Sequence, residues 1–232
     1  DENYPLKNSK LSRDFHQNRR DALRKKLLPE TAAVFFANPV RNKSNDVDFV
    51  YHQDPDFYYL TGFTEANSVL ILFKEPQKID RNMVQDILFI PPKDEQWELW
   101  NGVRMKAEDV KKENGIELIK PNTEFESFFD GAKMFKNLFY KPFPSGIQDD
   151  IHNSADLFDF KKNFEHFIGN NSINVNSSDL PRLMSELREI KLSEEITLLK
   201  KAIDITIKSQ TEIFKALRPS MTEFQVQAII EF

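Results

Sequence analysis

Three short, continuous runs of apolar residues constrain the fold of this chain more than any other feature. They lie at residues 32–37, 68–73 and 86–90, and prolines stand close to the ends of the first and third runs. A run of this length without polar alternation is typical of a strand that is buried on both faces. Such strands need helices on both sides of their sheet, so the sequence predicts an α/β domain.

Segments with helical periodicity accompany these runs. Residues 9–27, 106–113, 123–136, 147–167 and 179–190 are predicted helices, and residues 116–119 and 138–140 are further short strands. In the first helix, Leu23 and Leu27 continue an apolar face, whereas Arg20 and Arg24 are expected to face water. Together with the apolar runs, these segments indicate an α/β domain that ends at about residue 176.

Residues 49–63, FVYHQDPDFYYLTGF, form the densest aromatic stretch of the chain. The Asp-Pro pair predicts a turn, and residues 57–60 are expected to form a short aromatic strand that ends at Thr61-Gly62. Two carboxylates that flank a proline usually form the turn itself rather than a catalytic pair. We therefore interpret His52 and Asp54 as structural residues.

A long amphipathic helix is predicted to begin at Ser193. Its apolar side chains lie on one stripe, formed by Ile196, Leu199, Ile203, Ile207, Phe214 and Leu217. Thr222 and Gln225 are spaced to open one more helix, whose apolar face stops at Phe232 without a capping signal. We expect these last helices to need a partner, as in a truncated chain.

Composition excludes several classes of protein and site. The 232 residues carry a formal net charge of −5 with both signs mixed along the chain, so no nucleic-acid partner is expected. No apolar run approaches the ~20 residues that span a bilayer, so no membrane partner is expected. The absence of cysteine excludes disulfides and thiolate sites but leaves the compartment open, either cytoplasmic or exported after removal of a signal.

The sequence contains no recognisable set of catalytic residues that would make it a complete enzyme. The chain contains no HExxH, G-x-S-x-G, GxGxxG or Walker A pattern, and its four histidines lack the spacing of metal ligands. On its residues alone, this chain does not look like an enzyme that carries its own catalytic machinery.

Several stretches nevertheless resemble one family in register along the chain. HQDPDFYYLTGF at residues 52–63 is similar to the signature of the N-terminal domain of aminopeptidase P, in the creatinase/prolidase or "pita-bread" superfamily. Residues 98–104 (ELWNGVR), 187–196 (LREIKLSEEI) and 218–223 (RPSMTE) resemble further segments of that family. Asn101 stands where the family usually has an aromatic residue, and Ser220 stands where it has glycine.

The resemblance implies a fold and a division of the chain. The fold would be a mixed, ribonuclease H-like sheet of about five or six strands with helices on both faces. Residues 1–176 would form the aminopeptidase P N-terminal domain. Residues 177–232 would form a linker helix and the first helices of a truncated pita-bread catalytic domain.

The resemblance also implies a function for the parent protein. Such enzymes are Xaa-Pro aminopeptidases, which release the N-terminal residue from peptides with proline in second position. Two divalent metal ions, expected to be manganese, belong to the catalytic domain, so we assign no metal ligand and no catalytic residue here and expect this chain alone to be inactive. The parent is expected to be a homo-oligomer, a dimer or a tetramer.

One residue is a candidate for contact with substrate. Trp100 matches the family position that reaches toward the substrate channel, one wall of which the N-terminal domain supplies. An indole face suits the ring of a proline-containing peptide. Packing against Trp97 is an equally simple interpretation of the same residue, and the sequence leaves both open.

Two other functions also remain open. A chain without its catalytic half could serve as a free-standing peptide-binding or scaffold module. A prolidase-type dipeptidase would share the architecture, but the YYLTGF form of the signature is closer to aminopeptidase P.

Overall fold

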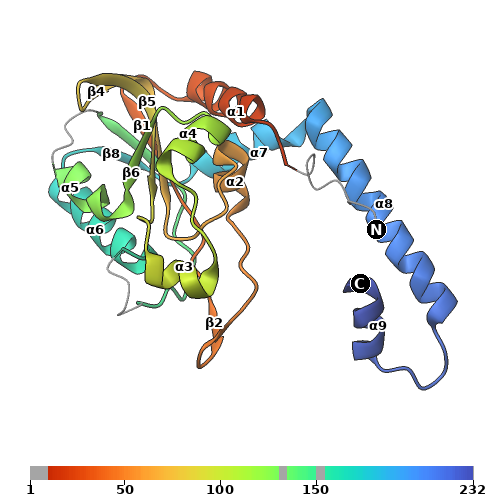
Figure 1. Ribbon diagram of the computed structural model, residues 1–232. Helices are drawn as coiled ribbons and strands as arrows, with labels where there is room; N and C mark the ends of the chain where they lie inside the picture. Colours follow the sequence, from red (N-terminus) through yellow and green to blue (C-terminus); the bar gives the residue numbers. More distant parts are fainter. Residues whose placement is uncertain (1–9, 131–134, 150–154, 232) are drawn as a thin grey trace. The chain divides into compact units, whose positions relative to one another are not determined.

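The computed structural model describes residues 10–130, 135–149 and 155–231 (Figure 1). The chain divides into two compact units. One unit is Ser12–Glu189, and the other contains the segment Ile190–Phe232. The first unit therefore extends beyond the boundary near residue 176 that the sequence predicts for the N-terminal domain, and it includes the helix that follows.

A six-stranded sheet forms the centre of the Ser12–Glu189 unit, in the order β6-β5-β4-β1-β7-β8. The strands are β1 Thr31–Phe36, β4 Val69–Ile79, β5 Asn82–Ile90, β6 Leu118–Pro121, β7 Asn137–Tyr140 and β8 Asn174–Asn176. β4 is antiparallel to β1 and β5, and the other neighbours pair in parallel. The predicted mixed sheet of about five or six strands is therefore confirmed.

The three apolar runs of the sequence are the three central strands. Ala33, Ile71 and Leu88 have no exposed surface, as expected for strands covered on both faces. β4 and β5 are longer than the apolar runs, because their far ends form a hairpin with more polar residues.

Helices cover both faces of this sheet (Figure 1). One face carries α1 Arg13–Lys26, α2 Pro55–Thr61, α4 Ala107–Asn114 and α7 Asp179–Glu189, and α1 contacts each of the other three. The other face carries α5 Phe125–Asp130 and α6 Leu157–Asn170, with the 3-10 turn Asn122–Glu124 before α5. The predicted two-sided covering is confirmed.

Phenylalanines fill the layer between the sheet and α5 and α6. The Phe125 ring lies 5.5 Å from that of Phe89 on β5, 5.0 Å from Phe129 and 5.2 Å from Phe160, all in edge-to-face arrangements. The predicted helices 123–136 and 147–167 include residues 131–134 and 150–154, which lie outside the described residues. Residues 147–149 are not helical, because Asp156 caps α6 by accepting the Asp159 N–H at 2.9 Å.

The predicted aromatic strand at residues 57–60 is wrong, because this stretch forms the helix α2. Asp54 Oδ1 accepts the N–H groups of Asp56 and Phe57 at 2.9 and 3.0 Å, and Pro55 fits the first helical position. Gly62, with φ +68°, ends the helix and donates its N–H to the Tyr58 carbonyl at 2.7 Å. Caps at both ends therefore outweigh the strand preference of the aromatic residues.

The expected exposure of Arg20 and Arg24 is also wrong. Arg20 has no exposed surface and Arg24 has 8%. Arg20 Nε donates to Asp86 Oδ2 at 2.8 Å, Nη1 donates to the Leu60 carbonyl at 2.8 Å, and Nη2 donates to the Gly115 carbonyl. This buried arginine joins α1 to β5 and to the ends of α2 and α4, so burial lowers the pKa of its guanidinium while Asp86 opposes that shift.

The remaining described elements are one short hairpin and three helices. The strands β2 Asn42–Ser44 and β3 Val47–Asp48 form a two-stranded sheet, and α3 is Glu95–Asn101. In the other unit, α8 is Ser193–Ala216 and α9 is Glu223–Glu231. Ser193 is the first residue of α8, and Leu192 is the N-cap residue before it. At the start of α9, Thr222 and Gln225 exchange the predicted hydrogen bonds. Among the described residues, no helix combines the length and apolarity needed to cross a bilayer.

Candidate functional site

A groove of about 980 Å³ opens at one edge of the six-stranded sheet. Its walls include Pro39 after β1, Pro91 after β5, Asn122 after β6 and Asn67 before β4. Because β1, β5 and β6 point the same way, their carboxyl ends meet at this edge. Crevices outside the carboxyl ends of strands are the usual ligand sites of open α/β sheets.

The lining of the groove is acidic and partly aromatic. Tyr51 and Trp97 contribute rings to its walls. The charged lining residues are the acids Asp48, Glu65, Asp94, Glu95 and Asp156 and the bases Lys93 and Arg104. Burial raises the pKa of the Tyr51 hydroxyl, with a further contribution from Asp54, and the hydroxyl donates to the Asn38 carbonyl at 3.1 Å.

Trp100 lies on α3. It is close in sequence to residues that line the groove, but it is not a lining residue itself. Asp94 Oδ1 caps α3 by accepting the N–H groups of Gln96 and Trp97, both at 3.0 Å. Trp100 is 85% exposed, and its neighbours Leu99 and Val103 are 79% and 84% exposed. Packing as a core residue is therefore excluded for Trp100 in this chain, whereas its role as a channel wall stays a prediction.

Trp97, in contrast, is held in place by Arg104. The Arg104 Cζ lies 4.0 Å from the centroid of the Trp97 ring, within the range of a cation–π interaction. Arg104 Nη1 also donates to the Pro92 carbonyl at 2.8 Å, and its backbone N–H donates to Glu98 Oε1 at 3.2 Å. These contacts join the two ends of the segment 92–104, a loop in which Trp100 is exposed to solvent.

Glu65 joins the same loop to the groove. Its Oε1 accepts the Met105 N–H at 3.0 Å. Burial raises the pKa of the Glu65 carboxyl, the Met105 N–H and Arg104 oppose the shift, and Glu98 adds to it. The sequence did not single out Glu65, although its place shortly after the LTGF signature was the available signal.

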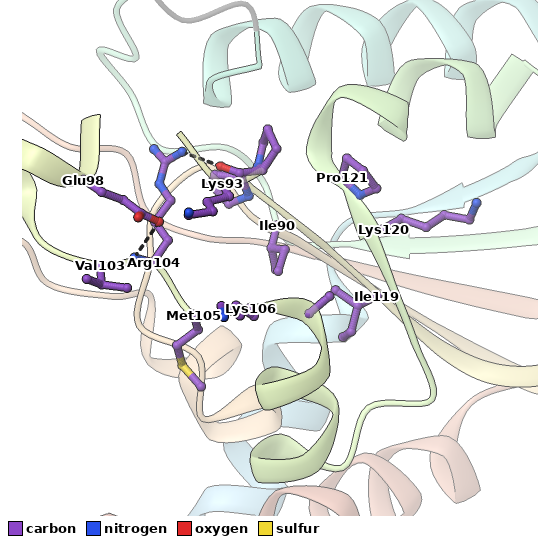
Figure 2. Close-up of a pocket in the computed structure, with 13 residues that line it drawn as sticks. Ile90, Lys93, Glu98, Val103, Arg104, Met105, Lys106, Ile119, Lys120 and Pro121 are labelled. Carbon is purple, nitrogen blue, oxygen red and sulfur yellow. Dashed lines mark hydrogen bonds between the residues drawn. The ribbon is translucent and has the colours of Figure 1, made fainter. Parts of the chain in front are cut away.

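A second, smaller cavity lies beside the same loop (Figure 2). It has a volume of about 200 Å³, and it shares Pro91, Pro92, Lys93 and Arg104 with the groove. Figure 2 shows the Arg104 guanidinium directed at the Pro92 carbonyl and the Glu98 carboxylate directed at the Arg104 backbone. We call this cavity the apolar pocket.

The aspartates of the aromatic stretch lie in an ion cluster rather than in a catalytic pair. Lys141 Nζ lies 2.7 Å from Asp54 Oδ2 and 3.2 Å from Asp56 Oδ2, and Arg188 Nη1 lies 2.7 Å from Asp56 Oδ1. The interpretation of Asp54 as a turn-former is confirmed, since it also caps α2. The side chain of His52 is exposed.

One acidic group was not anticipated from the sequence. Asp149, Asp156 and Asp159 place carboxylate oxygens within 4.8 Å of one another. Burial raises the pKa of the Asp159 carboxyl, and the nearby Asp156 and Asp149 add to the shift. Since Asp156 already serves as the cap of α6, we assign this group to the start of that helix and not to a metal.

Known proteins match this chain over almost its whole length. The profile described as "Aminopeptidase P, N-terminal domain" matches residues 16–138. Xaa-Pro aminopeptidase of Escherichia coli is 29% identical over 226 residues, which cover 96% of this chain and 49% of that protein. A solved variant of Escherichia coli aminopeptidase P has a TM-score of 0.76 at 28% identity, and it covers 96% of this chain and 49% of its own.

A further structure supports the fold alone. Pseudomonas aeruginosa aminopeptidase PepP has a TM-score of 0.78 at 22% identity, over 96% of this chain and 48% of its own. This chain thus spans about half the length of the relatives that it matches, and the part matched is the non-catalytic N-terminal half. The chain belongs to the family of the aminopeptidase P N-terminal domain.

Proposed function

We propose that this chain supplies the N-terminal half of a metal-dependent Xaa-Pro aminopeptidase. The parent enzyme releases the N-terminal residue from peptides that have proline in second position. The observation that carries the proposal is the alignment with Escherichia coli Xaa-Pro aminopeptidase over 96% of this chain but only 49% of that protein. This partial coverage is what we expect if the chain is one half of an enzyme and works together with a catalytic domain.

The proposed division places the N-terminal domain at residues 1–176, and a linker helix and the first helices of the catalytic domain at residues 177–232. Exposed apolar side chains on α8 and α9 support this division, among them Leu199 at 50%, Phe214 at 80% and Phe224 at 78% exposure. Amphipathic helices are stable in water when their apolar faces are covered. The cover would come from the rest of the catalytic domain.

The chemistry belongs to that catalytic domain. Two divalent metal ions, expected to be manganese, would be held there, where such ions supply an activated water at neutral pH. The groove and α3 of this chain would contribute to substrate binding and to contacts between subunits of a dimer or tetramer. Trp100 would form one wall of the substrate channel, since its exposed indole can cover the ring of a proline residue.

The test compares this 232-residue chain with a longer protein that includes the catalytic domain, on an Xaa-Pro peptide with added Mn²⁺. We expect turnover by the longer protein and none by the shorter chain. Turnover by the shorter chain would refute the division of labour. A longer protein that binds the peptide without cleaving it would instead indicate a scaffold module.

The role of Trp100 is tested in the longer protein. Trp100→Ala should lower kcat/KM by about 10-fold, because a stacked aromatic ring commonly contributes on the order of 1 kcal/mol or more. Leu99→Ala is the matched control, since Leu99 is equally exposed on the same helix but is not at the family's channel position. Equal effects of the two substitutions would remove Trp100 from the substrate site.

A further inference from the structure

The apolar pocket combines a hydrophobic interior with a positively charged rim (Figure 2). Ile90 at the end of β5, Ile119 on β6 and Met105 in the loop before α4 contribute apolar side chains to its lining. Its volume of about 200 Å³ is enough for one aliphatic side chain and the groups next to it. The whole pocket is formed within the Ser12–Glu189 unit.

Cations outnumber anions around this pocket. Lys93, Arg104 and Lys106 line it, against the single carboxylate of Glu98. Lys120 also lines it, but its ammonium group lies 2.6 Å from Asp80 Oδ2 and 3.0 Å from Glu124 Oε2, and Figure 2 shows its side chain extending away from Arg104. We therefore leave Lys120 out of the positive rim.

The three remaining cations differ in how strongly they are neutralised. Lys93 pairs with Glu95 at 3.2 Å, but both side chains are more than half exposed, so the pair is weak. Arg104 donates to a neutral carbonyl and stacks on Trp97, and the nearby Glu65 carboxyl offsets part of its charge. Lys106 is the N-cap residue of α4 but makes no side-chain capping hydrogen bond, and the positive end of the α4 dipole adds to its charge.

We propose that the apolar pocket binds the C-terminal residue of a peptide when that residue is aliphatic. The side chain would enter between Ile90, Met105 and Ile119, and the free carboxylate would lie against Lys106. A C-terminal residue carries a full negative charge one carbon away from its side chain, whereas an internal residue offers only a neutral amide. Charge complementarity thus selects a chain end, as in other sites that capture peptide termini.

This inference goes beyond the proposed aminopeptidase activity and does not depend on it. The proposed catalysis acts at the N-terminus of a peptide in another domain, whereas this pocket would recognise the opposite end of a chain. Binding is measured on the 232-residue chain without turnover, so the two proposals can fail separately.

The experiment titrates the 232-residue chain with N-acetyl-leucine and, separately, with N-acetyl-leucinamide, followed by NMR. We expect N-acetyl-leucine to shift the methyl signals of Ile90, Met105 and Ile119. The amide, which lacks the charge, should bind about 5-fold more weakly, in line with a partly exposed charge interaction. Added salt should narrow that difference, because it screens exposed charges.

Two exposed lysines, Lys106 at the start of α4 and Lys111 within it, provide a matched pair of variants. Lys106→Gln should weaken binding of N-acetyl-leucine about 5-fold, whereas Lys111→Gln, an identical charge change on the exposed surface of α4, should leave it unchanged. Equal binding of acid and amide, or equal effects of the two variants, would overturn the proposal. Inorganic phosphate that produces the same methyl shifts would also overturn it, since it would indicate a general anion site.

Discussion

Apolar side chains are placed in opposite ways in the two compact units of this molecule. In Ser12–Glu189, residues such as Ala33, Ile71 and Phe89 have no exposed surface. In α8 no residue is buried, although Ile203 and Phe214 belong to an equally regular apolar stripe. The difference teaches that periodicity identifies the apolar face of an element, but it does not tell whether the chain at hand contains the surface that covers it.

Charged side chains extend this comparison. In Ser12–Glu189, Arg20 is fully buried and its guanidinium bonds a carboxylate and backbone carbonyls on several elements. In α8 the ion pair of Lys215 with Glu212, at 2.6 Å, lies on a surface where both side chains are at least 60% exposed. Only a buried network such as that of Arg20 couples elements that are distant in the sequence, whereas an exposed ion pair within one helix does not.

The largest expected effect is on hydrogen exchange. Amides of β1, β4 and β5 should exchange at least ~10³-fold more slowly than amides of α8 and α9, because the strands open only when the buried core unfolds. Exchange measured by mass spectrometry on the 232-residue chain gives both rates in one sample. Comparable protection of α8 and the central strands would break the contrast between the two units.

Removal of the buried arginine should have the next largest effect. Arg20→Met should lower the free energy of unfolding by about 3–5 kcal/mol, because the carbonyls of Leu60 and Gly115 lose this donor in a dry environment and Asp86 keeps only Arg24 and the Glu117 N–H. Urea denaturation of the variant and the wild type gives the difference.

An exposed ion pair provides the control for this substitution. Lys136 Nζ lies 2.8 Å from Glu30 Oε2, and the two side chains are 75% and 54% exposed. Lys136→Met should therefore change the free energy of unfolding by less than about 1 kcal/mol. Similar losses for both variants would mean that burial does not distinguish Arg20 from a surface charge.

The sequence predicted the central strands, because continuous apolar runs have few alternatives to burial. It failed at α2 and Arg20 for different reasons. At α2, aromatic composition favoured a strand, and the caps at Asp54 and Gly62 decided otherwise. At Arg20, a basic residue on an amphipathic helix predicts exposure, and the sequence does not reveal the partner Asp86 because it is 66 residues away.

The candidate site was less accessible to sequence reasoning than the fold. The resemblance led to Trp100 directly, and the structure exposes that residue on α3. The groove and the apolar pocket could not be predicted, because they depend on which strands run side by side and in which direction. Glu65 and Met105 meet only through that topology.

The smallest expected effect concerns Glu65. Its carboxyl is half-buried and therefore lies between the buried charge of Arg20 and the exposed charges of the surface ion pairs. Burial raises its pKa above the usual value of 4.5, so the folded chain holds this proton at a pH where the unfolded chain has released it. Stability contributed by Glu65 should therefore fall as pH rises from about 4.5 through its raised pKa. Glu65→Gln keeps an acceptor for the Met105 N–H but does not titrate. The free energy of unfolding of the variant, measured by urea denaturation, should therefore rise relative to that of the wild type as pH increases over that range. A difference that does not change with pH would show that water reaches this carboxylate as freely as it reaches a surface glutamate.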